Sequence, residues 1–332
     1  METNLYDITR IAQTIGNRPE YVQGGGGNVS LKVDSETLAV KASGFRLGDL
    51  RVDHGFVAIN YLNVRTFYET TASGQPLADL ISASDENVNA SILETTGRRP
   101  SIETGFHAIL GQCVVHTHSV YANILTCSAE GVAIATQLFP TAVFVPYQTP
   151  GVTLTIAIKH AIADSDANII FLKNHGIITV GDTPDAAYAL HEYVTQTIRD
   201  YFSITATYPN LALMPTPTGF ASASPELPAL IERNQNFVTG FAETTLFPDQ
   251  IVYGEKVGFG EADKAIMIDV ATGSITYAVS RGEALAFEET LTAWLCIIEM
   301  ITSANLTLVT IPAHEGAIIA GLESEKYRQA IL

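Results

Sequence analysis

The sequence predicts an α/β protein, in which a mixed N-terminal domain with a central sheet covered by helices precedes a small C-terminal α+β domain. Hydrophobic residues make up 47% and charged residues 16% of its 332 residues, as in a well-packed globular protein. Helix-like and strand-like patterns interleave up to residue 202, which favours a sheet with helices on it. A proline-rich stretch then separates this pattern from the rest of the chain.

That proline-rich stretch, residues 207–228, holds five of the chain's 14 prolines, with Ser, Thr and Gly between them. Neither helical nor strand periodicity holds there, so we expect a linker or a long surface connection. A chain of this length also favours two domains. We therefore predict one domain over residues 1–210 and a second over residues 211–332.

The first half of the N-terminal domain is expected to contain helices and one pair of strands. Residues 4–16 carry apolar side chains at helical spacing and end on a glycine. Residues 28–33 and 36–43 are typical of two strands joined by a turn. Residues 84–97 begin with Ser and two acids, as helices do, and residues 100–111 predict a short helix behind Pro100.

The second half of this domain continues with alternating elements. We expect a strand over residues 112–118 and a helix over 119–128. Another helix is predicted over 151–164, followed by two strands around a turn within 167–181. A long amphipathic helix then covers residues 183–202, opening with a Thr-Pro pair that suits a helix start.

The C-terminal part gives weaker patterns. Residues 247–259 and 264–279 indicate strands with a hairpin, and residues 288–304 an amphipathic helix, before residues 324–332 close the chain. We find no separate cluster of catalytic residue types there. We expect this part to serve packing or oligomerisation, and to shape the entrance to a site in the first domain.

Charge and composition exclude several classes of protein. The net charge of −17 repels nucleic acid and anionic lipid, so we expect neither as a partner. A phosphorylated substrate would need local compensation by a metal, a Lys or backbone N–H groups. The acidic start of the chain does not resemble a signal peptide, and the apolar stretch 291–301 is too short to span a bilayer. The three cysteines show no CxxC spacing, so we expect a cytoplasmic protein.

The strongest candidate site lies in the strand "QCVVHTH". Residues i and i+2 of a strand point to the same face, so His116 and His118 would project side by side while Thr117 points the other way. Two imidazoles on one face suit a metal, and His175, in a turn beside Gly176, is the best candidate for a third ligand. The alternatives are a buried, hydrogen-bonded histidine pair and an ordinary turn residue.

Glu103 is the candidate proton carrier, because it lies just upstream of the histidine strand. It is four residues from His107, so the two share a face if this stretch is helical. Glu103 could instead be a first-turn residue favoured by the helix dipole. For His107 we expect a structural role on the helix face.

A run of four glycines, residues 24–27, would let backbone N–H groups approach an anion. A second turn of small residues, "KASG" at 41–44, brings Lys41 near it. The two turns either bound one anion pocket or are simply loops. No dinucleotide-binding or Walker motif accompanies them, so nucleotide binding is not supported.

Five motifs in this order resemble the class II aldolase/adducin superfamily, above all its fuculose-phosphate and rhamnulose-phosphate aldolases. The resemblance covers residues 5–205 and implies a mixed α/β domain with a largely antiparallel central sheet between helix layers. The motifs are "GGGGNVSLK", "VKASG", "PSIETGFHAIL", "VVHTHSVYANILTCS" and "LKNHGIITVGDTPDAA".

The resemblance also implies roles for individual residues. His116, His118 and His175 match the family's zinc ligands, and Glu103 matches its acid/base glutamate. The positions that line the family's substrate and phosphate pocket are matched by Gly27, Asn28, Ser43, Gly44 and Ser101. Two departures stand out: Ile102 replaces a second serine, which removes one phosphate hydrogen bond, and residues 122–146 lack the catalytic tyrosine of the fuculose-phosphate aldolase.

The implied activity is that of an aldolase that depends on Zn²⁺ or another divalent metal. It would cleave or form a C–C bond in a small sugar or sugar-phosphate through a metal-stabilised enediolate. A sugar-phosphate 4-epimerase or a dehydratase on the same site is the alternative, although the epimerases tend to have Asp where Glu103 stands. A non-catalytic, adducin-like protein would lack the metal histidines. The family also implies a homo-oligomer, commonly a tetramer.

Overall fold

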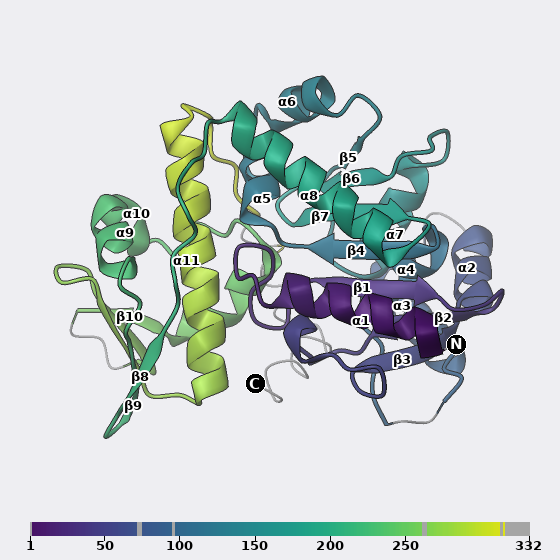
Figure 1. The fold of residues 1–332 in the computed structure, drawn as a ribbon, viewed down its shortest axis with the longest axis horizontal. Helices are drawn as coiled ribbons and strands as arrows, with labels where there is room; N and C mark the ends of the chain where they lie inside the picture. The colour runs from purple at the N-terminus through teal and green to yellow at the C-terminus, as the bar shows by residue number, and fades with distance from the viewer. Residues whose placement is uncertain (1, 72–74, 95–96, 261–263, 313–314, 316–332) are drawn as a thin grey trace.

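The computed structural model of this protein describes residues 2–71, 75–94, 97–260, 264–312 and 315, so the predicted end segment 324–332 lies outside the described residues. Figure 1 shows two sheets with one long helix, α11, between them. The elements up to residue 202 are α1 (Glu2–Gly16), β1 (Asn28–Lys32), β2 (Thr37–Lys41), η1 (Leu47–Asp49), β3 (Phe56–Asn60), α2 (Tyr61–Thr70), α3 (Leu77–Ala90), α4 (Thr104–Ile109), β4 (Cys113–Thr117), α5 (Val120–Thr126), α6 (Gly131–Leu138), β5 (Val143–Val145), α7 (Val152–Ala161), β6 (Ile169–Leu172), β7 (Gly176–Gly181) and α8 (Pro184–Tyr201). Those that follow are β8 (Leu213–Thr216), β9 (Gly219–Ser222), α9 (Leu227–Arg233), α10 (Gln235–Val238), η2 (Pro248–Lys256), β10 (Val257–Phe259), β11 (Ile266–Asp269), β12 (Ser274–Tyr277) and α11 (Arg281–Ser303).

The first sheet has seven strands in the order β3-β2-β1-β4-β7-β6-β5. Every neighbouring pair is antiparallel except β5 and β6, which run parallel. The expected fold class, a mixed and largely antiparallel sheet between helices, is therefore confirmed. β4, the predicted histidine strand, lies in the middle of this sheet and pairs with β1 and β7.

Helices cover both faces of this sheet. α1, α5 and α8 pack on one face, and α2, α4 and α7 lie over the other. The side chains of β4 follow the strand period, because Cys113 and Val115 enter the core of the first face and Val114 enters that of the second. His116 has the parity of Val114 and accordingly meets Phe106 of α4.

The first domain differs from expectation in one helix and contains several elements that were not predicted. The helix expected over 84–97 begins at Leu77 and ends at Ala90, because apolar residues before 84 already face the core and Pro76 provides the start. The elements that were not predicted include β3, α2, α6 and β5. β3 runs directly into α2, where the Asn60 side chain caps the helix by accepting a hydrogen bond from Asn63 N–H.

The prediction of an irregular linker over residues 207–228 is wrong. It contains the hairpin β8–β9, which joins a five-stranded sheet of order β10-β11-β12-β9-β8. Pro215 lies within β8, which is the edge strand of this sheet. Proline has no backbone N–H, but on the open side of an edge strand no neighbouring strand needs one as a hydrogen-bond donor. The proline content of this stretch therefore reflects an edge strand with its turn.

The C-terminal elements pack directly onto the first domain. α11 lies against α5 on one side and against η2 and α9 on the other, and its inner side chains share one apolar core with α1, α5 and α8. After α11 the chain returns along the first domain, where Ala129 N–H donates to Thr307 and Val309 N–H donates to Cys127. Within the described ranges, no helix has both the length and the apolarity that crossing a membrane requires.

Candidate metal centre

The two histidines of β4 lie at the end of the strand, in a fully buried setting. His116 is opposite Asn28 of β1 and Ile178 of β7 in the sheet register. Its ring is 0% exposed and that of His118, one residue beyond the strand, is 4% exposed. Thr117 points to the other face, where its hydroxyl lies 2.8 Å from His191 Nε2 of α8. The expected same-face arrangement of His116 and His118 is confirmed.

His175 comes from the tight turn between β6 and β7. Asn174 holds the left-handed backbone conformation in this turn, with φ of 50°. A Cβ on Gly176, which follows His175, would lie 2.1 Å from the carbonyl oxygen of Thr117, so only glycine allows the turn to approach β4 this closely. The turn thereby delivers the third imidazole beside the first two.

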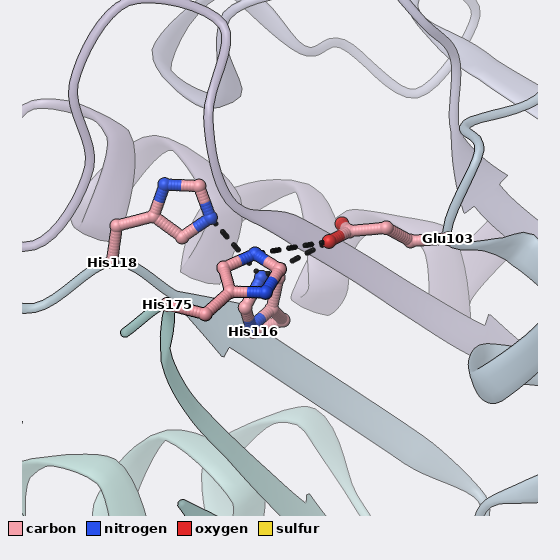
Figure 2. Close-up of side chains that lie close together, drawn as sticks. All are labelled: Glu103, His116, His118 and His175. Atoms are coloured by element: carbon pink, nitrogen blue, oxygen red, sulfur yellow. Dashed lines mark hydrogen bonds and ion pairs between the residues drawn. The ribbon is translucent and has the colours of Figure 1, made fainter. Parts of the chain in front are cut away.

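Glu103 completes the cluster from the N-terminus of α4, where it is 7% exposed. Its Oε1 lies 3.3 Å from His116 Nε2 and 3.4 Å from His175 Nε2, and the two Nε2 atoms of His116 and His118 are 3.2 Å apart. Figure 2 shows all four side chains converging on one point. The four potential ligand atoms all lie within 4.8 Å of one another.

The partners of the three Nδ1 atoms, the ring nitrogens that do not face the cluster, show how the imidazoles are oriented. His116 Nδ1 donates to the carbonyl oxygen of Ile177 at 3.0 Å. His118 Nδ1 is hydrogen-bonded to the carboxylate of Asp249, from η2 of the C-terminal part. The Nδ1 of His175 is buried and has no hydrogen-bond partner among the described residues. Each of the three rings thus turns its Nε2 toward the cluster.

Electrostatics favour an anionic Glu103 that is stabilised by the neighbouring imidazoles. Burial acts to raise the pKa of Glu103, but His116 and His175 outweigh burial and hold this pKa well below its usual value. Burial also acts to lower the pKa of His116, and the charge of Glu103 outweighs it, so that pKa is raised. Burial lowers the pKa of His175 to about 4, which keeps its lone pair free.

These residues fit a divalent metal ion. Three buried Nε2 atoms supply the three protein ligands typical of catalytic zinc sites, and one carboxylate oxygen lies beside them. A simple hydrogen-bonded pair of buried histidines would not bring a third imidazole and a carboxylate to the same point. The set can hold a metal through the histidines, with Glu103 at the open position or beside it.

The residues expected to bind substrate gather in two places. Asn28 is fully buried beside His116, and neither its amide nitrogen nor its amide oxygen has a hydrogen-bond partner among the described residues. Gly27 precedes it with φ of 68°, and a Cβ there would lie 2.5 Å from Val22. An unsatisfied buried amide beside the cluster is consistent with a group that binds a ligand.

Ser43 and Ser101 line a cavity of about 480 Å³. Ser43 N–H donates to Arg99 at 2.9 Å, which holds the turn that includes Gly44 against the segment before Glu103. Gly44 has φ of 81° and forms this turn without strain. Ile102 also lines the cavity, so an apolar side chain stands where the family has a second serine.

His107 has the structural role expected for it. It is fully buried, and its Nδ1 lies 2.7 Å from the hydroxyl of Ser30 on β1. Burial lowers the pKa of His107 to about 3, so the ring is neutral in the folded protein.

Two residues next to the histidines were not predicted from the sequence. Asp249 contacts His118, and Asn174 donates from its side chain to Leu246 at 3.1 Å and to Val309 at 2.8 Å. Asp249 is 131 positions away from His118 in the chain, and its motif "FPDQ" has no periodicity that would mark it. Asn174 could have been noticed as a turn residue, two positions before Gly176, of a type that tolerates a left-handed conformation.

This chain is similar in sequence to several known proteins. The family "Class II Aldolase and Adducin N-terminal domain" matches residues 7–202. An uncharacterized oxidoreductase, YuxG of Bacillus subtilis, is 28% identical over 200 residues, which is 57% of this chain and 28% of that protein. This chain therefore matches well under half the length of YuxG. The L-fuculose phosphate aldolase of Methanococcus vannielii is 25% identical over 197 residues, covering 58% of this chain and 92% of that enzyme.

Among solved structures, the N-terminal class II aldolase domain of a conserved protein from Thermoplasma acidophilum is similar in fold. It is 25% identical, has a TM-score of 0.52, and the match covers 59% of this chain and 92% of that domain. The matched region contains the seven-stranded sheet, the three histidines and Glu103. The chain belongs to the class II aldolase and adducin N-terminal domain family.

Proposed function

We propose that this protein is a metal-dependent aldolase that cleaves or forms a C–C bond in a small sugar or sugar-phosphate. The observation that carries the proposal is the convergence of Glu103 with three Nε2 atoms in one buried cluster. His116, His118 and His175 would hold a divalent cation, with Zn²⁺ the ion that best suits three imidazoles. When bound, the cation would act as a Lewis acid toward the enediolate formed as the C–C bond breaks.

Glu103 would move the proton at the donor carbon. Its Oε1 lies 3.3 Å and 3.4 Å from two of the imidazoles, so a substrate oxygen held at the cluster would place the donor carbon within reach of the carboxylate. Its low pKa keeps it anionic in the resting site. In synthesis it would remove the proton from the donor carbon, and in cleavage it would deliver to that carbon the proton that the substrate hydroxyl gives up as the C–C bond breaks.

The remaining predicted residues would bind the rest of the substrate. The unsatisfied amide of Asn28 would satisfy a hydroxyl or phosphate oxygen, and the turns at Gly27 and Gly44 would present backbone N–H groups to it. Ser43 and Ser101 would add hydroxyl donors along the cavity. Ile102 offers no hydrogen bond there, so we propose that the substrate carries fewer polar contacts at this end than in the fuculose-phosphate aldolases.

The test measures metal content and retro-aldol turnover on a panel of ketose 1-phosphates and free ketoses. We expect one zinc per chain, lost in His116→Ala, and a Glu103→Gln variant that keeps the metal while its turnover falls by about 10²–10⁴-fold. NMR of the products separates two cleaved fragments from an epimerised or dehydrated sugar. A metal-free wild type with full turnover would refute the proposal.

Three further properties belong to the same proposal. We propose that the protein acts in the cytoplasm, that it forms a homo-oligomer, and that domains 1–210 and 211–332 are its units. Native mass spectrometry gives the oligomeric state, and limited proteolysis shows whether cleavage concentrates near residue 210. Resistance at that position would argue against the domain division.

A further inference from the structure

We propose that Asp249 is a positioning residue of the metal centre. Its carboxylate accepts the Nδ1–H of His118 and fixes that ring with Nε2 toward the other ligands. The inference rests on the proposed function, because it takes the histidine cluster to be a metal site. It goes further by giving part of that site to the C-terminal region, outside the family match at 7–202.

The backbone around Asp249 is fixed by contacts within its own segment, in addition to the contact with His118. It is 3% exposed and lies in η2, in a segment where Leu246 and Phe247 are fully buried. Gln250 fixes the backbone that precedes Asp249, since its side-chain oxygen accepts from Leu246 N–H at 2.9 Å and its amide donates to Thr244 at 3.0 Å. The carboxylate therefore has a set position relative to the first domain.

The contact determines which nitrogen of His118 carries the proton. An ionised carboxylate can only accept a hydrogen bond, so the Nδ1 of His118 is the donor and its Nε2 keeps a lone pair. That Nε2 lies 3.2 Å from His116 Nε2, inside the cluster. A carboxylate behind a metal-binding imidazole fixes both the ring orientation and its basicity.

The three imidazoles differ in the hydrogen-bond partner of their Nδ1 atoms. His116 has a backbone carbonyl of the same sheet, Ile177, and His175 has no partner at Nδ1 among the described residues. His118 is the one whose Nδ1 partner is a charged side chain from beyond residue 202. Its orientation therefore depends on how the C-terminal region packs.

Gly26 makes room for this contact. A Cβ at Gly26 would lie 2.8 Å from Asp249 Oδ2 and 2.9 Å from His118 Nδ1. Both separations are too short for a carbon atom, so a methyl group at this position would push the carboxylate and the ring apart. The third glycine of the run is thus required by the hydrogen bond of His118, independently of any anion.

The experiment compares Asp249→Asn with Asp269→Asn, a matched substitution at an exposed turn of the same region. Zn²⁺ affinity is measured by competition with a chromophoric chelator, and Co²⁺ is bound separately to record its visible spectrum. We expect Asp249→Asn to bind Zn²⁺ about 10–100-fold more weakly and to shift the Co²⁺ bands. Asp269→Asn should match the wild type, and Gly26→Ala should resemble Asp249→Asn.

The outcomes are distinguishable. If Asp249→Asn keeps the wild-type affinity and Co²⁺ spectrum, the role of Asp249 is refuted while the metal centre stands. If the wild type binds neither metal, the proposed metal centre fails and this inference falls with it. If Asp249→Asn does not fold by circular dichroism, ¹⁵N-histidine NMR of the zinc-bound wild type decides. There His118 must carry its proton on Nδ1, and any other tautomer refutes the assignment.

Discussion

The two parts of this molecule present their chemistry in opposite ways. Residues 7–202 match a known family and provide all four members of the cluster, from motifs that are visible in the sequence. The part after residue 202 shows only weak patterns, yet it places Asp249 on His118, and Leu246 and Val309 on the side chain of Asn174. The reactive groups thus lie in one part, and part of their support comes from the other.

This difference teaches that a family match can delimit the ligands of a site without delimiting the site. The two parts also share one apolar core, in which α11 packs against α5. Arg46 of the first part pairs with the buried Glu289 of α11, which also accepts from Gly24 N–H at 2.8 Å. If the two parts unfold as one unit, a change in either part should alter the stability of both.

The largest effect is expected from Phe287→Ala in α11. Phe287 is fully buried against the rings of Phe241, Tyr253 and Tyr277, so its removal should lower the free energy of unfolding by about 3–5 kcal/mol. Urea unfolding is followed by the fluorescence of Trp294, the chain's one tryptophan, and by far-UV circular dichroism.

Because the core is shared, both probes should shift together in Phe287→Ala. Tyr6→Ala, at a side chain that is 63% exposed, serves as the control and should change little. A fluorescence transition that moves while the dichroism transition stays would show that the C-terminal part unfolds separately.

A smaller effect is expected on acidification, and it should originate in the first part. The pKa of His107 is lowered by burial to about 3, against about 6.5 in the unfolded chain. Its contribution to stability is therefore complete above pH 6.5 and is lost progressively as the pH falls toward 3. For this one group the loss between pH 7 and pH 5 should be roughly 2 kcal/mol.

His107→Gln removes this titration, so its stability should fall less steeply between pH 7 and pH 5 than that of the wild type. Metal-free protein is used for both, with urea midpoints measured by Trp294 fluorescence. Since the fluorophore lies in α11 and the titrating group in α4, a shallower slope would show that the two parts are coupled. Parallel curves for wild type and variant would contradict the prediction.

The smallest effects are expected from one helix cap in each part. Thr183 caps α8 by accepting from Ala186 N–H at 3.2 Å, and Ser280 caps α11 by accepting from Glu283 N–H at 3.1 Å. Thr183→Ala and Ser280→Ala should each cost about 1 kcal/mol in thermal or urea unfolding. Unequal costs, with Ser280→Ala near zero, would indicate that α11 contributes to the transition less than α8 does.

The sequence was informative where the pattern is local. The strand period put His116 and His118 on one face, and the structure agrees because β4 is a regular central strand. Both the expected proximity of Glu103 to these residues and the long helix ending at Tyr201 agree as well. The start of α3 was missed because its apolar first turn, which includes Leu80 and Ile81, lies before the Ser and two acids that are typical of a helix start.

Other features could not be predicted because they depend on contacts between distant segments. Pro215 looked like part of a linker, and only the neighbouring strands show it to be at a sheet edge. Asp249 had no local pattern, and its role follows from the packing of η2 over His118. The glycine run was expected either to bound an anion pocket or to be simply a loop, whereas the absence of a Cβ at Gly26 also leaves space for the Asp249 contact.

The late position of Asp249 and Val309 in the chain has a consequence for synthesis. Ribosomes add about 5–20 residues per second, so the last of the histidines, His175, is made roughly 7–27 s before the chain reaches residue 309. During that interval the family domain exists without the carboxylate behind His118 and without the carbonyl that holds Asn174. The orientation of two of its imidazoles is therefore completed only after the segment up to residue 309 has been made, so the proposed metal centre would be fully ordered only once this later region has folded onto the first.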